Sequence, residues 1–278
     1  MKMDQIAFLP FLPTFQSETR LVANLMFYGL ERPLSRDWVQ LIEQQFVRYS
    51  LEPQELCYTA HSKDKSGDYS SLKSELEDAL SCNAKYELKS IRVRSKAVAP
   101  EDGFLPCDME ISVDTGGPTH ARGSISVSID KAPDLEEFAT QTSHDVSRIG
   151  GCYYGHSSLF PAILGPEYYL GSVGTIPKGW SFISTRAYTK RLTAWRDHGA
   201  NRISLNGYFR EVFPYNFLTK HHLNQRILGK PAADLFKEFG TLEEFGASAS
   251  QYVWKVPLVL IPKAREVLEE ANLVLSAR

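Results

Sequence analysis

One short stretch, residues 150–161 with the sequence GGCYYGHSSLFP, carries the residue types of an active site. Gly155-His156-Ser157 resembles the start of a nucleophile elbow, Gly-x-Ser-x-Gly, in which a strained turn exposes a serine. Leu159 stands where that motif needs its second glycine, and no hydrophobic strand precedes it. We therefore interpret the stretch as a glycine-rich link between two halves, with its tyrosines packed and their hydroxyls at the surface. A serine-type hydrolase using Ser157 is kept as the alternative.

A second motif has the spacing of a calcium-binding loop. Its oxygen-bearing residues match positions one, three, five, seven and twelve, and are Asp64, Ser66, Asp68, Ser70 and Glu75. That loop needs glycine at position six, where this chain has Tyr69. We expect a polar loop that caps the helix after it.

The remaining candidates for a metal site also lack a necessary element. His221 and His222 are adjacent, so on a helix they point about 100° apart, and we interpret them as part of a solvated basic face. The four cysteines include no Cys-x-x-Cys pair, so we expect reduced thiols. The sequence thus predicts no metal, no cofactor and no catalytic residues, which favours a binding protein over an enzyme.

Composition narrows the class of partner. The 278 residues carry a formal net charge of −2, which disfavours nucleic acid because phosphate binding requires a basic face. Asp4, Pro10 and Pro13 interrupt the apolar amino terminus, unlike a secretory signal. No run of about 18 apolar residues follows. We expect a cytoplasmic protein without a membrane segment.

The hydrophobic pattern predicts an α+β fold. Apolar residues recur every three to four positions in several segments, as in amphipathic helices; one helix begins at Ser35 and another at Pro133-Asp134. Between these helices the apolar residues alternate with polar ones, as in half-buried antiparallel strands. In the carboxy-terminal half we expect a strand over 202–213, a helix over 218–228 and a strand over 252–261 that contains Pro257. We predict an antiparallel sheet with helices packed on one face. The chain forms either a single domain, 1–278, or two pseudo-domains, 1–150 and 151–278.

The carboxy-terminal half resembles the immunity protein 52 family over about residues 150–230. The matching positions are Gly179, Trp180, Gly207, His222, Leu223 and Ile227. The resemblance implies a protein that protects bacteria from a polymorphic toxin, including toxins delivered by type VI secretion. It implies as partner a cognate toxin, often a nuclease of the restriction-endonuclease type, and it carries over no catalytic residue.

Such a protein needs an interface, and a basic nuclease cleft would be complemented by acidic residues beside aromatic anchors. Two tyrosine pairs flank the loop-rich region after residue 150, and one has an adjacent glutamate. We predict contacts from Tyr153, Tyr154, Glu167, Tyr168 and Tyr169. The competing site is the acidic edge formed by Glu110 and Asp114.

Overall fold

The computed structural model describes residues 20–30, 34–60, 63–81, 88–98, 105–115, 122–150, 152, 154–162, 207–245 and 251–274. Its strands are β1 (Leu21–Tyr28), β2 (Pro53–Ala60), β3 (Lys63–Asp68), β4 (Leu88–Ser95), β5 (Met109–Asp114), β6 (Arg122–Ser128), β7 (Tyr154–Pro161), β8 (Tyr215–Thr219), β9 (Arg226–Ile227), β10 (Lys230–Pro231), β11 (Thr241–Phe245) and β12 (Gln251–Lys255). Its helices are α1 (Arg36–Arg48), α2 (Tyr69–Ser81), α3 (Leu135–Gly150), α6 (Lys220–Leu223), α7 (Ala232–Phe239) and α8 (Ile261–Glu270), with a 3-10 turn η5 (Leu258–Leu260).

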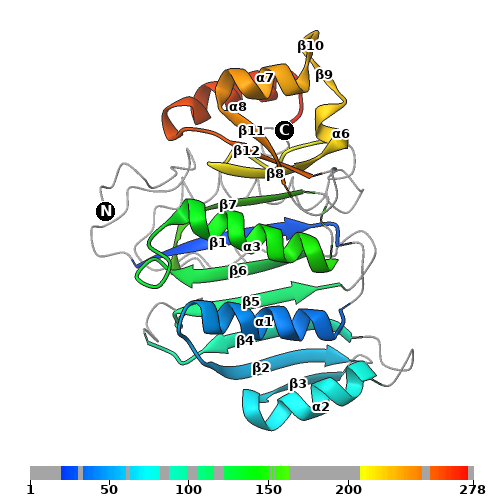
Figure 1. Ribbon diagram of the computed structural model, residues 1–278, viewed down its shortest axis with the longest axis vertical. Coiled ribbons are helices and arrows are strands. Elements are labelled where there is room, and N and C mark those ends of the chain that lie inside the picture. The colour runs from blue at the N-terminus through cyan, green and yellow to red at the C-terminus, as the bar shows by residue number, and fades with distance from the viewer. Residues whose placement is uncertain are drawn as a thin grey trace, which may run out of the picture.

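Ten of these strands form one sheet, in the order β11-β12-β8-β7-β1-β6-β5-β4-β2-β3. Each neighbouring pair in it is antiparallel. The strands stack along the long axis of the molecule, and α1 and α3 lie across the front of them (Figure 1). The predicted α+β class with an antiparallel sheet is confirmed. Strand β1 pairs with β6 on one side and β7 on the other, so the sheet continues across residue 150.

In the first half of the chain, the segments with a regular hydrophobic pattern fold as that pattern predicts. Helix α1 follows Ser35 and buries the stripe of Trp38, Leu41, Ile42 and Phe46. The alternating segments become β4, β5 and β6, with Ile111 and Ile125 facing each other in register. These strands can be predicted because one face is apolar and the other polar.

The segment expected to be a polar loop, Asp64 to Ser70, is largely a strand. Residues Lys63–Asp68 form β3, which pairs with β2 at the end of the sheet. An edge strand with little buried surface needs no alternation of apolar and polar residues, so its polar sequence resembles that of a loop. The predicted capping role holds, because Asp68 accepts a hydrogen bond from the Ser71 amide at 3.2 Å.

The stretch interpreted as a glycine-rich link is instead an inner strand, so that interpretation is wrong. Strand β7 pairs with β1 along its whole length, from Leu21↔Pro161 to Tyr28↔Tyr154. A side chain at Gly155 would place its Cβ 2.8 Å from the Met26 carbonyl oxygen, so glycine permits the close approach of β7 and β1. His156, Ser157 and Ser158 are fully buried. Because they are polar, the hydrophobicity pattern gives no sign that this segment is a buried strand.

The carboxy-terminal half departs most from the predicted elements. The helix expected over Leu218–Leu228 begins as strand β8, continues as the short α6 and ends in the β9–β10 hairpin. The strand expected through Pro257 stops at Lys255, and β11, which no pattern predicted, forms the sheet edge. Of the strand expected over 202–213, the described residues 207–213 hold only a bridge from Phe209 to Val274.

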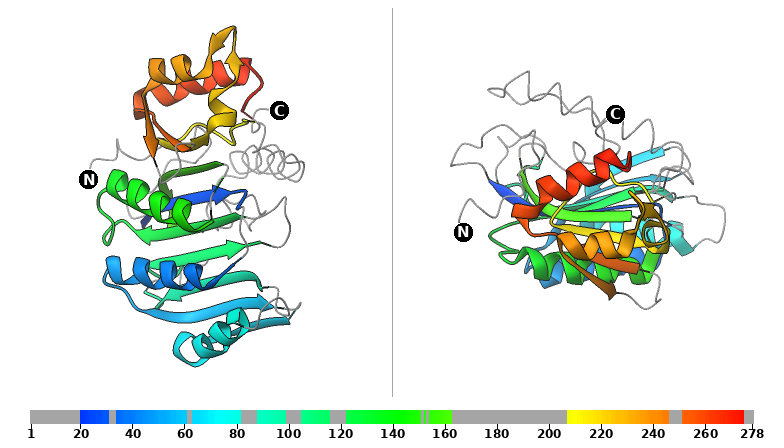
Figure 2. Two further views of the ribbon diagram at one scale, coloured as in Figure 1. Left: turned by 45° about the vertical axis from the view of Figure 1, so that its right-hand side comes forward. Right: turned by 90° about the horizontal axis from the view of Figure 1, so that it is seen from above.

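Alternating side chains of β1 separate two hydrophobic cores. Ala23, Leu25 and Phe27 pack in the core that contains α1 and α3. Val22, Met26 and Tyr28 pack in the other, which contains buried residues of α7 and α8. Successive residues of a strand point to opposite faces, so the two cores lie on opposite faces of the sheet. The helices therefore do not all share one face as predicted; α1 and α3 do (Figure 2).

Candidate functional site

A row of side chains crosses the sheet where α3 begins. In register, Thr241 of β11 lies opposite Lys255 of β12, Lys255 opposite Tyr215 of β8, and Tyr215 opposite Ser157 of β7. Directly opposed residues of antiparallel strands project from the same face. The sheet thus places an ammonium beside a phenol, although 40 residues of sequence separate them.

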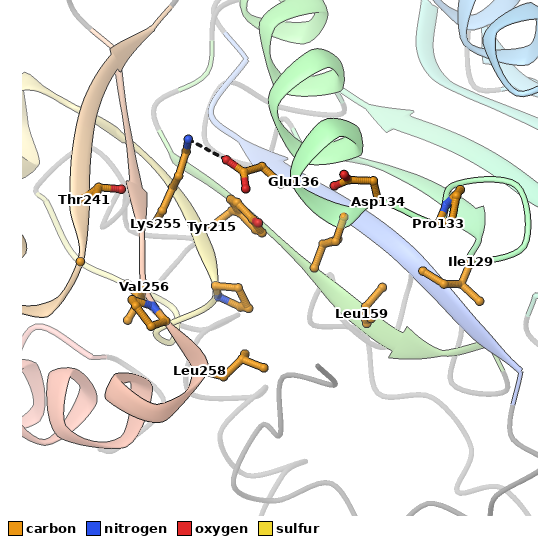
Figure 3. A pocket seen from close by; sticks show the side chains of 14 residues that line it. Ile129, Pro133, Asp134, Glu136, Leu159, Tyr215, Thr241, Lys255, Val256 and Leu258 are labelled. Carbon is orange, nitrogen blue, oxygen red and sulfur yellow. Dashed lines mark hydrogen bonds and ion pairs between the residues drawn. The ribbon is translucent and has the colours of Figure 1, made fainter. Parts of the chain in front are cut away.

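A groove of about 550 Å³ opens over this row. The residues of the described chain that line it are Ile129, Pro133, Asp134, Leu135, Glu136, Leu159, Pro214, Tyr215, Gly240, Thr241, Lys255, Val256, Pro257 and Leu258. Apolar side chains such as Leu159, Val256 and Leu258 form part of its wall, and the charged groups of Lys255, Glu136 and Asp134 lie along one side (Figure 3). We call this the Tyr215 groove.

Lys255 connects three elements around the groove. Its Nζ lies 2.9 Å from a carboxylate oxygen of Glu136 on α3 and 2.9 Å from one of Glu243 on β11. The hydrogen bond to Glu243, helped by Glu136, raises the pKa of Lys255, although burial opposes the shift. The ammonium therefore stays charged at neutral pH.

Tyr215 supplies a polar group that nothing else in the described chain uses. Burial, together with the carboxylates of Glu136 and Asp134, raises the pKa of Tyr215 to about 12. The phenol thus stays protonated and can donate a hydrogen bond. Its hydroxyl makes no hydrogen bond to a described residue, so none of these residues competes for it.

The first turn of α3 supplies the carboxylates. Asp134 caps the helix, because its Oδ1 accepts a hydrogen bond from the Glu137 amide at 3.0 Å. A helix amino terminus favours negative charge, which explains why acidic residues gather there. With Asp134, Glu136 and Glu243 against Lys255, the groove and its rim carry three negative charges and one positive charge.

The groove has an apolar rim as well. Pro257 is exposed, Leu258 lines the cavity, and Val259 next to it is 85% exposed. These three consecutive residues place apolar area at the edge of the groove. The groove therefore offers apolar area, a phenol and net negative charge, which suit recognition of a basic, partly apolar surface.

Most of the predicted contact residues lie outside the described residues. These are Tyr153, Glu167, Tyr168 and Tyr169, together with Gly179 and Trp180 of the family resemblance. Their role as contacts stays a prediction.

Tyr154, in contrast, is fully buried, so its expected exposure at an interface is wrong. Its ring stacks on Tyr28 and on His222 at centroid distances of 5.8 Å. Its hydroxyl donates to the Glu211 carbonyl at 3.3 Å, so the hydroxyl is not at the surface either. Tyr154 serves the core because its position in β7 faces the helices α7 and α8.

Glu110 and Asp114, the competing site, do not form an exposed acidic edge. Glu110 is 1% exposed and is held in an ion pair with Arg94 of the neighbouring strand. Asp114 is half-buried and lies opposite Arg122 in register. A buried and paired carboxylate cannot contact a partner's surface, so the prediction for Glu110 is wrong.

Ser157 lacks the setting of a nucleophile. It lies in the middle of β7, fully buried, and within the described part of the chain its hydroxyl has no hydrogen-bond partner. His156 is adjacent but points to the other face of the sheet, where its ring stacks on Phe213 at 3.7 Å. An activated serine requires a base within hydrogen-bond reach and access to substrate. The geometry does not support the hydrolase alternative.

His222 was expected to be solvated, and this expectation is wrong. It is fully buried; its Nδ1 accepts a hydrogen bond from the Thr219 amide at 3.2 Å. That leaves the proton on Nε2, which faces the Tyr208 carbonyl oxygen at 3.3 Å. Burial lowers the pKa of His222 to about 4, so the ring is neutral. Its neighbour His221 is exposed, as predicted.

The described residues contain no group of three or more histidine, cysteine, aspartate or glutamate side chains placed to hold a metal ion. Cys57, Cys107 and Cys152 are free thiols. Across the same residues, no helix has both the length and the apolar character needed to cross a bilayer.

Sequence reasoning missed the Tyr215 groove. It used Asp134 only as a helix cap and placed no functional weight on Tyr215 or Lys255. The pairing of β8 with β12 brings these residues together, and neither strand was predicted with its actual ends. The only local signal was the acidic first turn of α3, with Glu136 and Glu137 after Asp134.

Comparison with protein-family models gave no match, so the resemblance to the immunity protein 52 family gains no support from it. Comparison with curated proteins also gave no match. Among solved structures, the chain is similar to "Pseudomonas aeruginosa T6SS protein PA0821", with 10% sequence identity and a TM-score of 0.53 over 92% of this chain and 76% of that one. This likeness shows a shared fold.

A second structure is the toxic C-terminal tip of CdiA from Pseudomonas aeruginosa in complex with its immune protein. It matches at 12% identity and a TM-score of 0.24, over 51% of this chain and 88% of that chain. A TM-score this low does not establish a shared fold.

Proposed function

We propose that this protein is an immunity protein that binds a cognate toxin effector of a type VI secretion system and neutralises it. It acts in the cytoplasm by protein–protein interaction and turns over no substrate. The Tyr215 groove carries the proposal, because it combines exposed apolar area, an unused phenol and net negative charge on the described surface. These are the components of a recognition site for another protein.

Two further observations support the type VI context. The fold is shared over 92% of the chain with a protein whose name includes that secretion system. The sequence resemblance to the immunity protein 52 family at Gly207, His222, Leu223 and Ile227 points the same way.

The proposed toxin is a nuclease of the restriction-endonuclease type. A nuclease has a basic cleft because it holds a phosphate backbone. Asp134 and Glu136 complement such a cleft, and opposite charges also accelerate the encounter of the two proteins.

Co-expression tests the proposal. Bacteria expressing the protein encoded by the adjacent gene should stop growing, and they should recover when this chain is expressed with it. An adjacent product that is harmless, or toxicity that persists with the chain present in soluble form, would contradict the proposal. Nicking of chromosomal DNA in the unprotected cells would identify the toxin as a nuclease.

A further inference from the structure

We infer that the Tyr215 groove receives a cationic side chain, arginine or lysine, that the toxin presents. This inference rests on the proposed function and names the chemical group that the groove recognises. The charges that surround the groove do not balance.

Lys255 compensates only two of the three carboxylates. Its ammonium contacts Glu136 and Glu243 at 2.9 Å each. Asp134 uses Oδ1 to cap α3, and its described contacts include no cation. A carboxylate has about four acceptor sites, so Asp134 can accept further donors without giving up its role as a cap.

The position of Lys255 shows how a cation fits here. The side chain starts from β12 in the wall of the groove and reaches the first turn of α3 (Figure 3). A second cation, entering from outside, would find Asp134 on the other side of Tyr215. The field of the α3 amino terminus disfavours a cation by itself, but the carboxylates outweigh it because they carry full charges.

The apolar wall suits the rest of such a side chain. Lysine and arginine bury their methylene stems on apolar surface while the charged head remains with polar groups. Leu159, Val256 and Leu258 provide that surface. The ring of Tyr215 adds an aromatic face over which a cation is attracted, and its hydroxyl can accept as well as donate.

The experiment uses the whole protein and two short peptides. One peptide is acetyl-Gly-Arg-Gly-amide; the other replaces arginine with citrulline, which has nearly the same shape and no charge. Chemical shifts of the Leu159, Val256 and Leu258 methyl groups report on the groove during each titration. The arginine peptide should shift these signals with millimolar affinity, and the citrulline peptide should bind at least fivefold more weakly.

The variant Asp134→Asn/Glu136→Gln removes the two carboxylate charges of the groove lining. Asparagine caps a helix about as well as aspartate, so the variant keeps the cap. It should reduce the affinity for the arginine peptide by about tenfold, or 1.4 kcal/mol. Glu137→Gln is the matched control, since it removes a charge from the same helical turn at a position outside the groove lining, and it should bind like the wild type.

Equal binding of the two peptides, or unchanged binding to the double variant, would overturn the inference. So would the failure of the arginine peptide to shift the groove signals at all. None of these outcomes depends on the toxin, so the inference can fail while the growth test upholds the immunity function. Conversely, selective arginine binding with no protection from a toxin would uphold the groove chemistry and reject the proposed source of the side chain.

Discussion

The ammonium of Lys255 lies 2.9 Å from the carboxylate of Glu136, and this contact joins the end of β12 to the first turn of α3. It brings together two parts of the chain that lie 119 residues apart. The contact forms one side of the groove to which we assign recognition. Its removal therefore provides a direct test of how charge acts there.

We expect Lys255→Met to change stability little and to strengthen binding of the arginine peptide. The carboxylates it contacts are more than half exposed, at 58% and 52%, so losing these ion pairs should cost less than about 1 kcal/mol. Removing the ammonium leaves three uncompensated carboxylates around the groove, which should raise the affinity several-fold. Peptide titration followed by NMR measures this, and weaker binding would contradict the assigned role of charge.

Two buried asparagines should respond in opposite ways to replacement by leucine. Asn24 of β1 is fully buried, and neither its amide nitrogen nor its oxygen has a hydrogen-bond partner among the described residues. Asn216 of β8 is equally buried, but it bonds the amide and the carbonyl of Phe213 at 3.1 Å and 2.6 Å. An unsatisfied buried polar group costs about 1–3 kcal/mol, which an apolar side chain avoids.

Urea unfolding should therefore show Asn24→Leu as neutral or stabilised by about 1 kcal/mol and Asn216→Leu as destabilised by about 2–3 kcal/mol. A loss at Asn24 as large as that at Asn216 would mean that the Asn24 amide is bonded in solution.

Gly240 and Gly229 separate a steric effect from a backbone effect. A Cβ at Gly240 would lie 1.9 Å from the Lys255 carbonyl oxygen, so Gly240→Ala should disrupt the pairing of β11 with β12. Gly229 has φ +84 and open space around its Cβ position, so Gly229→Ala meets only left-handed strain, about 1 kcal/mol. Thermal unfolding should show the larger loss, about 2 kcal/mol or more, at Gly240. Comparable losses would contradict the close approach at Gly240.

Stability should fall in acid because buried His222 resists protonation. Its pKa is about 4 in the folded chain, as burial lowers it, against about 6.5 when unfolded. Between these values the unfolded state binds more protons, so stability is complete above about pH 6.5 and is lost as pH falls toward 4, by on the order of 3 kcal/mol. His156 adds an effect of the same sign, because burial and then Arg210 hold its pKa well below the ordinary value.

Urea unfolding at several pH values measures this loss. His222→Gln should be less stable at neutral pH and should show a shallower decline in acid. His221→Gln is the control, because His221 precedes it on the same helix but is exposed. A wild-type stability that does not change between about pH 7 and about pH 4.5 would contradict the account.

The sequence predicted elements wherever one face is apolar and the other polar. This is why the helix α1, starting after Ser35, and the alternating segments that become β4, β5 and β6 could be predicted. Strand β7 was missed because His156, Ser157 and Ser158 are buried polar residues, which a hydrophobicity pattern assigns to the surface. The same rule led to the wrong expectation for His222.

The groove was beyond sequence reasoning for a different reason. Tyr215, Lys255 and Asp134 come together only through the order of strands in the sheet and the place where α3 begins. Charge pattern alone pointed to Glu110, whose neighbour Arg94 already neutralises it. Recognising a usable carboxylate required knowing which ones are paired and buried.

The most direct test of the central claim is the dissociation constant of the purified protein with the purified product of the adjacent gene, measured by calorimetry. The account predicts tight binding, at about nanomolar level, with Asp134→Asn/Glu136→Gln weakened at least tenfold and Glu137→Gln unchanged. Undetectable binding of the wild-type protein to a folded, toxic product would contradict the claim that this chain neutralises its toxin by binding it.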